Sequence, residues 1–135
     1  MSGSATTTVV RGMFRRCGRC GGRRIFASYF RLKERCPTCG YRFVREPGAF
    51  TGAMLMNITA TFVLMFVTLV APVLWRGISG RDDIPWWPFV LGALGWAVLV
   101  PIVFYPIACS WWAAIDLAMR PLDPAEEADA ELHAA

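Results

Sequence analysis

Four of the five cysteines stand in two close pairs, Cys17-Gly-Arg-Cys20-Gly and Cys36-Pro-Thr-Cys39-Gly, with 15 residues between the pairs. A Cys-x2-Cys segment can curl so that both sulfur atoms face one ion, and a following glycine lets backbone N–H groups turn toward sulfur. Two such segments supply a tetrahedral set of four thiolates, which is the pattern of structural zinc sites. The spacing therefore predicts a metal site at these four cysteines.

Three other interpretations compete with zinc. Iron of the rubredoxin type is bound by the same cysteine pairs, so ligand chemistry alone leaves iron open. Disulfides are disfavoured if the cysteines face a reducing cytoplasm, and a thioredoxin-like redox site needs a βαβ context that this sequence does not predict. Four thiolates leave no open coordination position, so we expect a structural metal without a catalytic role. Its negative charge would be offset by neighbouring arginines, namely Arg15, Arg16, Arg19, Arg35 and Arg42.

The charges divide the 135-residue chain into segments. The first 46 residues carry a net charge of +9, whereas residues from Asp116 onward carry −5. We expect a loose N-terminal tail over residues 1–13, a four-cysteine zinc-ribbon module over 14–46 and an acidic tail over 119–135. Asp123, Pro124 and Glu126 form a helix-start signal within that tail. We also expect the acidic tail to contact the basic module, and Asp116 to pair with Arg42 or Arg45.

The region between these segments, residues 47–118, is apolar. Two uncharged runs, at about 49–75 and 86–115, each exceed the ~20 residues that cross a bilayer. The break between them holds Arg76 and Arg81 against two aspartates, Asp82 and Asp83. Positive charge gathers on the cytoplasmic side of membrane proteins, so the N-terminus is expected there, and a second span returns the C-terminus to the same side. The expected fold class is membrane α-helical: a two-span transmembrane hairpin with a small N-terminal cytoplasmic zinc-ribbon-like module.

Small, polar and proline residues within the two runs suit close helix packing and interhelical hydrogen bonds. The expected packing residues are Asn57, Thr61, Gly92, Gly95, Pro101 and Pro106. Neither run has a charged residue in its middle, so a transport path is not expected.

An aromatic and arginine cluster lies between the cysteine pairs. Exposed aromatic and arginine side chains are frequent hot spots of protein interfaces, so we expect Phe26, Tyr29, Phe30 and Arg31 to bind a partner. Nucleic-acid binding is the alternative for such a basic segment. It is disfavoured because contact with an anionic bilayer already accounts for the charge.

The run from Cys17 through Ile25, Phe26, Tyr29 and Phe30 to Gly40, followed by two apolar spans, resembles the bacterial membrane family called domain of unknown function 983. The resemblance covers roughly residues 14–120. It departs at Glu46-Pro47-Gly48, where the family often has Gly-Asp-Gly-Pro-like residues. It also departs after Pro106, where the family often has a basic residue. The resemblance implies a bacterial inner-membrane protein. Members of the family are sometimes encoded near haem–copper oxidase genes, so the resemblance implies a role in assembling respiratory complexes.

Taken together, these features predict no enzyme and no small-molecule substrate, because no nucleophile–base pair, phosphate-binding loop or open metal site is apparent. The expected function is that of a membrane-anchored adaptor, accessory subunit or assembly factor of a larger membrane complex. The alternative is a redox or metal-handling factor that uses the cysteines directly.

Overall fold

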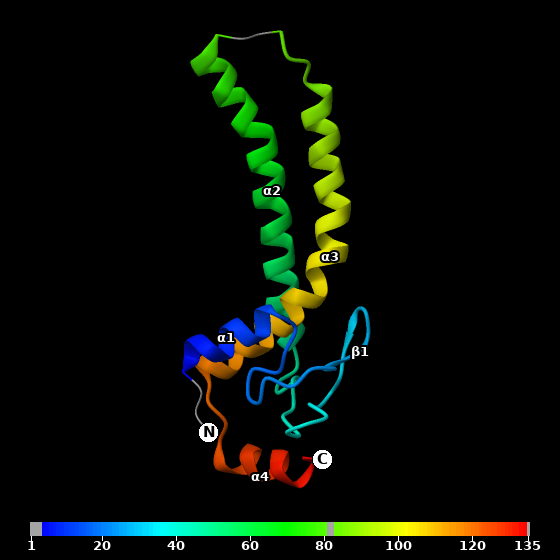
Figure 1. The fold of residues 1–135 in the computed structure, drawn as a ribbon, viewed down its shortest axis with the longest axis vertical. Coiled ribbons are helices and arrows are strands. Elements are labelled where there is room, and N and C mark those ends of the chain that lie inside the picture. Colours follow the sequence, from blue (N-terminus) through cyan, green and yellow to red (C-terminus); the bar gives the residue numbers. More distant parts are fainter. Residues whose placement is uncertain (1–3, 81–82, 135) are drawn as a thin grey trace. The chain divides into compact units, whose positions relative to one another are not determined.

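The computed structural model describes residues 4–80 and 83–134. Along the chain it contains helix α1 (Ala5–Met13), strands β1 (Phe26–Ser28) and β2 (Arg31–Leu32), and helices α2 (Ala49–Ser79), α3 (Trp87–Met119) and α4 (Pro124–Leu132), as drawn in Figure 1. Residues 1–3 of the predicted tail, Arg81 and Asp82 of the predicted break, and residue 135 lie outside the described residues. The chain divides into two compact units, Met1–Met56 with Tyr105–Ala135, and Asn57–Phe104.

Helices α2 and α3 are the two long apolar elements. They contain 31 and 33 residues, which at ~1.5 Å per residue exceeds a hydrocarbon thickness of about 30 Å. Only 6% and 17% of their most apolar stretches is buried within the chain, whereas the core helix of a soluble protein is mostly buried. Both helices are therefore long and apolar enough to cross a membrane. The predicted pair of helices is confirmed, and each continues past its predicted C-terminal end, to Ser79 and Met119.

Polar and small residues connect the two helices within the unit Asn57–Phe104. Asn57 is buried, and its side-chain amide donates a hydrogen bond to the carbonyl oxygen of Pro101 at 3.4 Å. The hydroxyl of Thr61 donates to the carbonyl of Asn57, one turn back in the same helix, at 2.9 Å. A Cβ at Gly92 would make ordinary contact with an α2 side chain at 3.5 Å. At Gly95, another predicted packing residue, a Cβ would meet no other described atom within 4 Å.

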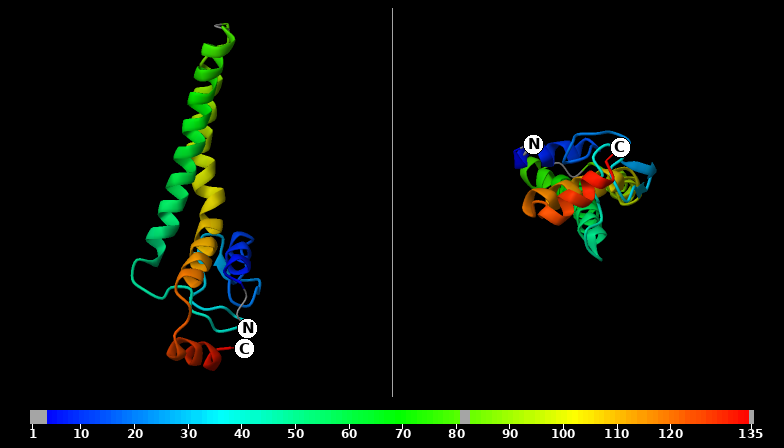
Figure 2. Two further views of the ribbon diagram at one scale, coloured as in Figure 1. Left: turned by 90° about the vertical axis from the view of Figure 1, so that its left-hand side faces the viewer. Right: turned by 90° about the horizontal axis from the view of Figure 1, so that it is seen from below.

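Helix α1 corrects the expectation of a loose tail for residues Ala5–Met13. It lies along the C-terminal part of α3, as both views in Figures 1 and 2 show. The hydroxyl of Ser110 donates to the carbonyl oxygen of Gly12 at 2.9 Å, and any side chain at Gly12 would overlap Ala114. Three consecutive threonines and two valines have weak helix propensity, so the local sequence gives no signal. The helix forms because α3 offers it a surface of small residues.

A small hydrophobic core holds the basic module together. Strands β1 and β2 form an antiparallel hairpin in which Phe26 pairs with Leu32. The core residues come from this hairpin, from the cysteine segments and from α3; they are Cys17, Ile25, Leu32, Cys36, Tyr41, Phe43 and Ala113. Pro106, a predicted packing residue, is also fully buried in this unit. The compact unit therefore extends beyond the predicted 14–46 module, because α3 completes its core.

Candidate metal centre

The two cysteine segments adopt the same backbone turn. In each, the carbonyl of the first cysteine accepts the N–H of the glycine four residues later: Gly21 to Cys17 at 2.8 Å, and Gly40 to Cys36 at 3.0 Å. Both glycines have positive φ, +74° and +66°, a conformation that costs an ordinary L-residue about 1–2 kcal/mol. The glycine after each Cys-x2-Cys segment is thus required by the turn that aims the sulfur atoms.

Backbone amides complete the turns and reach sulfur. The N–H of Cys17 donates to the carbonyl of Gly22 at 3.0 Å, and the N–H of Cys36 donates to the carbonyl of Tyr41 at 2.8 Å. The N–H of Gly22 points at the Sγ of Cys20, at 3.3 Å. Amide donors of this kind stabilise a thiolate and orient it toward a cation.

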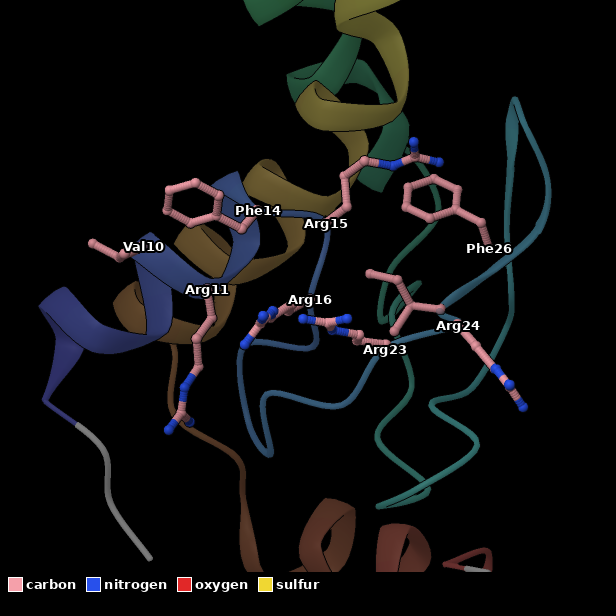
Figure 3. Close-up of a pocket in the computed structure, with 9 residues that line it drawn as sticks. Val10, Arg11, Phe14, Arg15, Arg16, Arg23, Arg24 and Phe26 are labelled. Atoms are coloured by element: carbon pink, nitrogen blue, oxygen red, sulfur yellow. The ribbon is translucent and has the colours of Figure 1, made fainter.

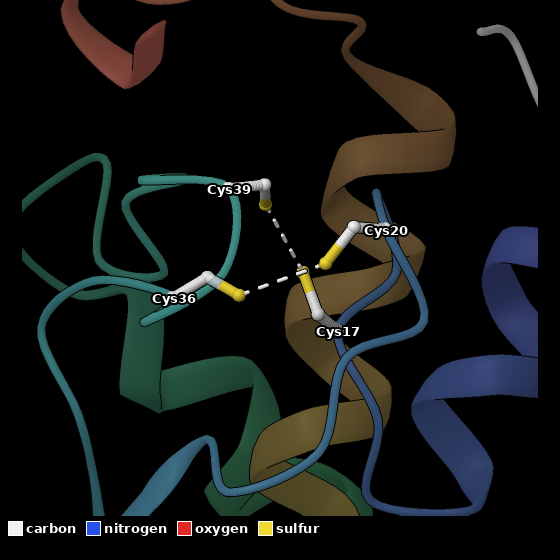
Figure 4. Close-up of side chains that lie close together, drawn as sticks. All are labelled: Cys17, Cys20, Cys36 and Cys39. Atoms are coloured by element: carbon white, nitrogen blue, oxygen red, sulfur yellow. Dashed lines mark hydrogen bonds between the residues drawn. The ribbon is translucent and has the colours of Figure 1, made fainter. Parts of the chain in front are cut away.

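The four sulfur atoms converge on one point, as Figure 4 shows. All lie within 4.8 Å of one another, with 3.8 Å between Cys17 and Cys39 and 3.7 Å between Cys20 and Cys36. A tetrahedral ion with metal–sulfur bonds of ~2.3 Å requires sulfur–sulfur edges of about 3.8 Å. The geometry fits a four-thiolate metal site, and tetrahedral sulfur suits zinc and iron alike. The predicted cluster of four cysteines is confirmed.

Protons and cations compete for this cluster. The pKa of Cys36 is held far below its usual range, because the neighbouring thiols of Cys17 and Cys39 donate hydrogen bonds to its thiolate. The pKa of Cys17 is raised in turn by its bond to Cys36 and by burial. A metal ion that binds all four sulfur atoms must therefore displace protons. Cys17 and Cys36 are buried, whereas Cys20 is exposed, so one side of the cluster faces solvent.

Two of the arginines predicted to offset the thiolate charge contact the second cysteine segment. Arg19 donates to the carbonyl of Cys39 at 3.4 Å, and Arg35 donates to the carbonyl of Gly40 at 3.5 Å. Arg42 instead lies 3.6 Å from the carboxylate of Glu34.

The acidic tail docks on the cysteine module, as expected from the charges. Helix α4 begins where predicted, and the N–H of Asp123 donates to the carboxylate of Glu126 at 3.0 Å. Arg35 binds Asp129 at 2.7 Å, and Arg45 binds Glu126 at 2.6 Å. These arginines hold the pKa values of both carboxyl groups below their usual range.

Arg45 also connects the module to the end of α3. Its guanidinium lies 3.6 Å from the carboxylate of Asp116, which confirms the pairing expected for this acid, and it donates to the carbonyl of Arg120 at 2.7 Å. Only 14% of the Arg45 side chain is exposed. One arginine thus joins the segment after the second cysteine pair, the end of α3 and α4.

The four residues expected to bind a partner all lie on the β1–β2 hairpin. Tyr29 and Phe30 form its turn and are 45% and 52% exposed, and Arg31 beside them is exposed. Phe26 is half-buried against the core. The ring of Phe30 packs 5.9 Å from the ring of Tyr105 on α3, so the turn of the hairpin rests against this helix.

Comparison with known proteins identifies the family. The family model described as protein of unknown function (DUF983) matches residues 26–116, and the chain belongs to this family. The match includes Cys36, Cys39, all of α2, and α3 as far as Asp116, whereas Cys17 and Cys20 precede it. No curated protein and no solved structure matches the chain.

Proposed function

We propose that this member of the family is a non-catalytic integral membrane protein, in which α2 and α3 anchor a structural zinc module. The exposed apolar surface of both helices supports the membrane anchor. In water this surface would stay in contact with solvent, which is unfavourable, whereas a bilayer would cover it. The four converging cysteines support a closed metal site without a position for substrate.

The proposed location is the bacterial inner membrane, with both ends of the chain in the cytoplasm. The membership of residues 4–56 and 105–134 in one compact unit supports a common side for the segments before α2 and after α3. This unit contains the +9 segment, which the positive-inside rule assigns to the cytoplasm. A reducing cytoplasm keeps the cysteines available for metal.

The module would act as an adaptor, accessory subunit or assembly factor for a larger membrane complex. The observation that carries this proposal is the pair of exposed aromatic rings at the hairpin turn. Tyr29 and Phe30 stack edge to face at 4.8 Å, next to the exposed Arg31. Aromatic and arginine side chains of this kind anchor protein interfaces, and their position beside α3 would place the contact at the membrane boundary. A respiratory oxidase is the first complex to test, since the family resemblance implies it.

Site-specific photocrosslinking in native membranes tests the adaptor role. A photoreactive amino acid replaces Phe30 in one variant and Thr38, an exposed residue of the second cysteine segment, in the control. We expect one recurrent membrane-protein partner, identified by mass spectrometry, at Phe30 and a much weaker signal at Thr38. Equal crosslinking at both positions, or crosslinks to lipid alone, would contradict the proposal.

A redox or metal-handling role is the second candidate, because the exposed Cys20 makes one edge of the cluster accessible. Elemental analysis of the purified chain separates the two candidates. One chelator-resistant zinc ion per chain supports the structural role. Labile metal, or reversible oxidation of the four thiols, supports metal handling, and one tightly bound iron ion would replace zinc as the resident metal.

A further inference from the structure

A wide pocket lies between α1 and the segment that leads into β1, as Figure 3 shows. Its volume is about 680 Å³. Five of the residues that line it are arginines: Arg11, Arg15, Arg16, Arg23 and Arg24. Figure 3 shows Arg16 and Arg23 close together, both extending toward the side of α1.

The positive charge of this pocket is not neutralised within the described part of the chain. No acidic residue lines the pocket there, and none of its five arginines is within ion-pair distance of a carboxylate. Those acidic side chains that the ion pairs of the described residues include contact other arginines, namely Arg35, Arg42, Arg45 and Arg120. Five arginines along one pocket, with no acid among its described lining residues, give the pocket a positive potential that a bound anion would offset. Guanidinium groups match phosphate in particular, because they can bind two of its oxygens at once.

The remaining wall of the pocket is apolar. Phe14 and Val10 on the α1 side are 70% and 46% exposed, and Phe26 lies on the opposite side. Inorganic phosphate gains nothing from such side chains. A lipid presents a phosphate and hydrocarbon together, and interfacial protein segments bind lipids through this combination of basic and apolar side chains.

Contacts with α3 place the pocket where the predicted second span ends. Helix α1 packs on Ser110 and Ala114, and the hairpin turn packs on Tyr105; all three belong to the apolar run 86–115. The guanidinium of Arg15 lies over the rings of Phe26 and Tyr29, at 4.7 and 5.7 Å, and so joins the pocket to that turn. Lipid phosphates lie at this level if α3 spans the membrane.

We infer that this pocket binds the phosphate of an anionic phospholipid headgroup, with acyl carbons against Val10 and Phe14. The inference rests on the membrane placement in the proposed function, but it requires no protein partner. Nucleic-acid phosphates would satisfy the arginines and bases can stack on Phe14 and Phe26, but a nucleic acid would give no role to Val10 or to the position of the pocket beside α3.

Lipid binding is measured on the full chain in a neutral detergent, by calorimetric titration with short-chain phosphatidylglycerol. The test variant is R16Q/R23Q. The control R31Q/R42Q removes the same charge from exposed positions outside the pocket. At ~1 kcal/mol per arginine, the test variant should lose about 10- to 30-fold in affinity. The control should lose less than about threefold, because it changes only the long-range field.

Three further titrations distinguish the source of the phosphate. Short-chain phosphatidylcholine should bind at least about tenfold more weakly than phosphatidylglycerol, since its headgroup has no net charge. Inorganic phosphate and glycerophosphoglycerol should also bind more weakly, because they lack acyl chains. Equal binding of any of these ligands, or tighter binding of a single-stranded oligonucleotide, would overturn the inference, as would equal losses in the two variants.

A measurement on the unmodified protein guards against a misfolded variant. A ligand that binds only the folded state raises the unfolding temperature, so phosphatidylglycerol should stabilise the wild-type chain more than phosphatidylcholine does. Equal stabilisation would refute specific headgroup binding. Crosslinking at Phe30 is independent of this result, so a missing protein partner and a missing lipid site can be told apart.

Discussion

Substituting alanine for Gly40 tests whether α4 is held against the second cysteine segment. Gly40 and Gly21 are equivalent in their turns, with φ of +66° and +74°, so alanine costs about 1–2 kcal/mol of backbone strain at either position. Their surroundings differ. A methyl group at Gly40 would overlap the carbonyl oxygen of Ala130 in α4 and would lie 2.9 Å from the adjoining carbonyl carbon. At Gly21 the nearest atom is 3.3 Å away, in the flexible side chain of Arg11.

The two variants therefore share the strain and differ only in the overlap with α4. Backbone atoms of a helix cannot rotate aside, so α4 must move and stretch the 2.7 Å contact between Arg35 and Asp129. Overpacking costs about 1–3 kcal/mol, which corresponds to a ~5- to 150-fold larger undocked population. A helix of nine residues is marginal on its own, so the undocked segment loses its helical hydrogen bonds.

Hydrogen exchange of the amides in Pro124–Leu132 measures this population. We expect exchange to accelerate at least about fivefold more in G40A than in G21A, while both variants keep the same metal content. Equal exchange rates would show that α4 does not rest on Gly40. Faster exchange in G21A would refute the argument altogether.

Three other outcomes follow from the contacts. C36S should lower bound metal below one ion per chain, whereas C109S, outside the cluster, should leave it unchanged by elemental analysis. G12V should detach α1 from α3 and expose residues 5–16 to protease, because valine would overlap Ala114; an unchanged digestion pattern would contradict that packing. The lowered pKa values of Glu126 and Asp129 mean that their ion pairs stabilise α4 docking above about pH 4.5 and lose this effect as pH falls below it, so hydrogen exchange of α4, corrected for the intrinsic rate, should accelerate only in acid.

The spacing of the cysteines along the sequence and the hydropathy pattern made the cysteine cluster and the two long helices predictable. A Cys-x2-Cys segment followed by glycine forms its turn from local sequence alone. An uncharged apolar run of this length is typical of a long membrane-crossing helix and of few other structures. The pairing of Asp116 with Arg45 was also predictable. Arg45 precedes the first apolar run and Asp116 follows the second, and a two-helix hairpin brings these two ends together.

Features that depend on tertiary contacts were not predictable. The residues of α1 have weak helix propensity. The helix forms because Gly12 and Ser110 allow its backbone to approach α3 closely. The five-arginine pocket joins residues of α1 to residues just before β1, and only the fold shows that these arginines line one pocket. A glycine in an apolar helix permits close approach without naming a partner, and a Cβ at Gly95 would meet no other described atom within 4 Å.

The contacts of the first cysteine segment bear on the choice between adaptor and metal carrier. Gly18 lies between α1 and α3, where a Cβ would be 3.0 Å from Thr8 and 3.3 Å from Ala114. Arg45 fixes the other segment to the end of α3. A carrier must open its ligand set to release an ion, yet here opening would disrupt the packing of both helices and the core around Cys17. The packing of the cluster therefore supports the proposed structural role over metal exchange.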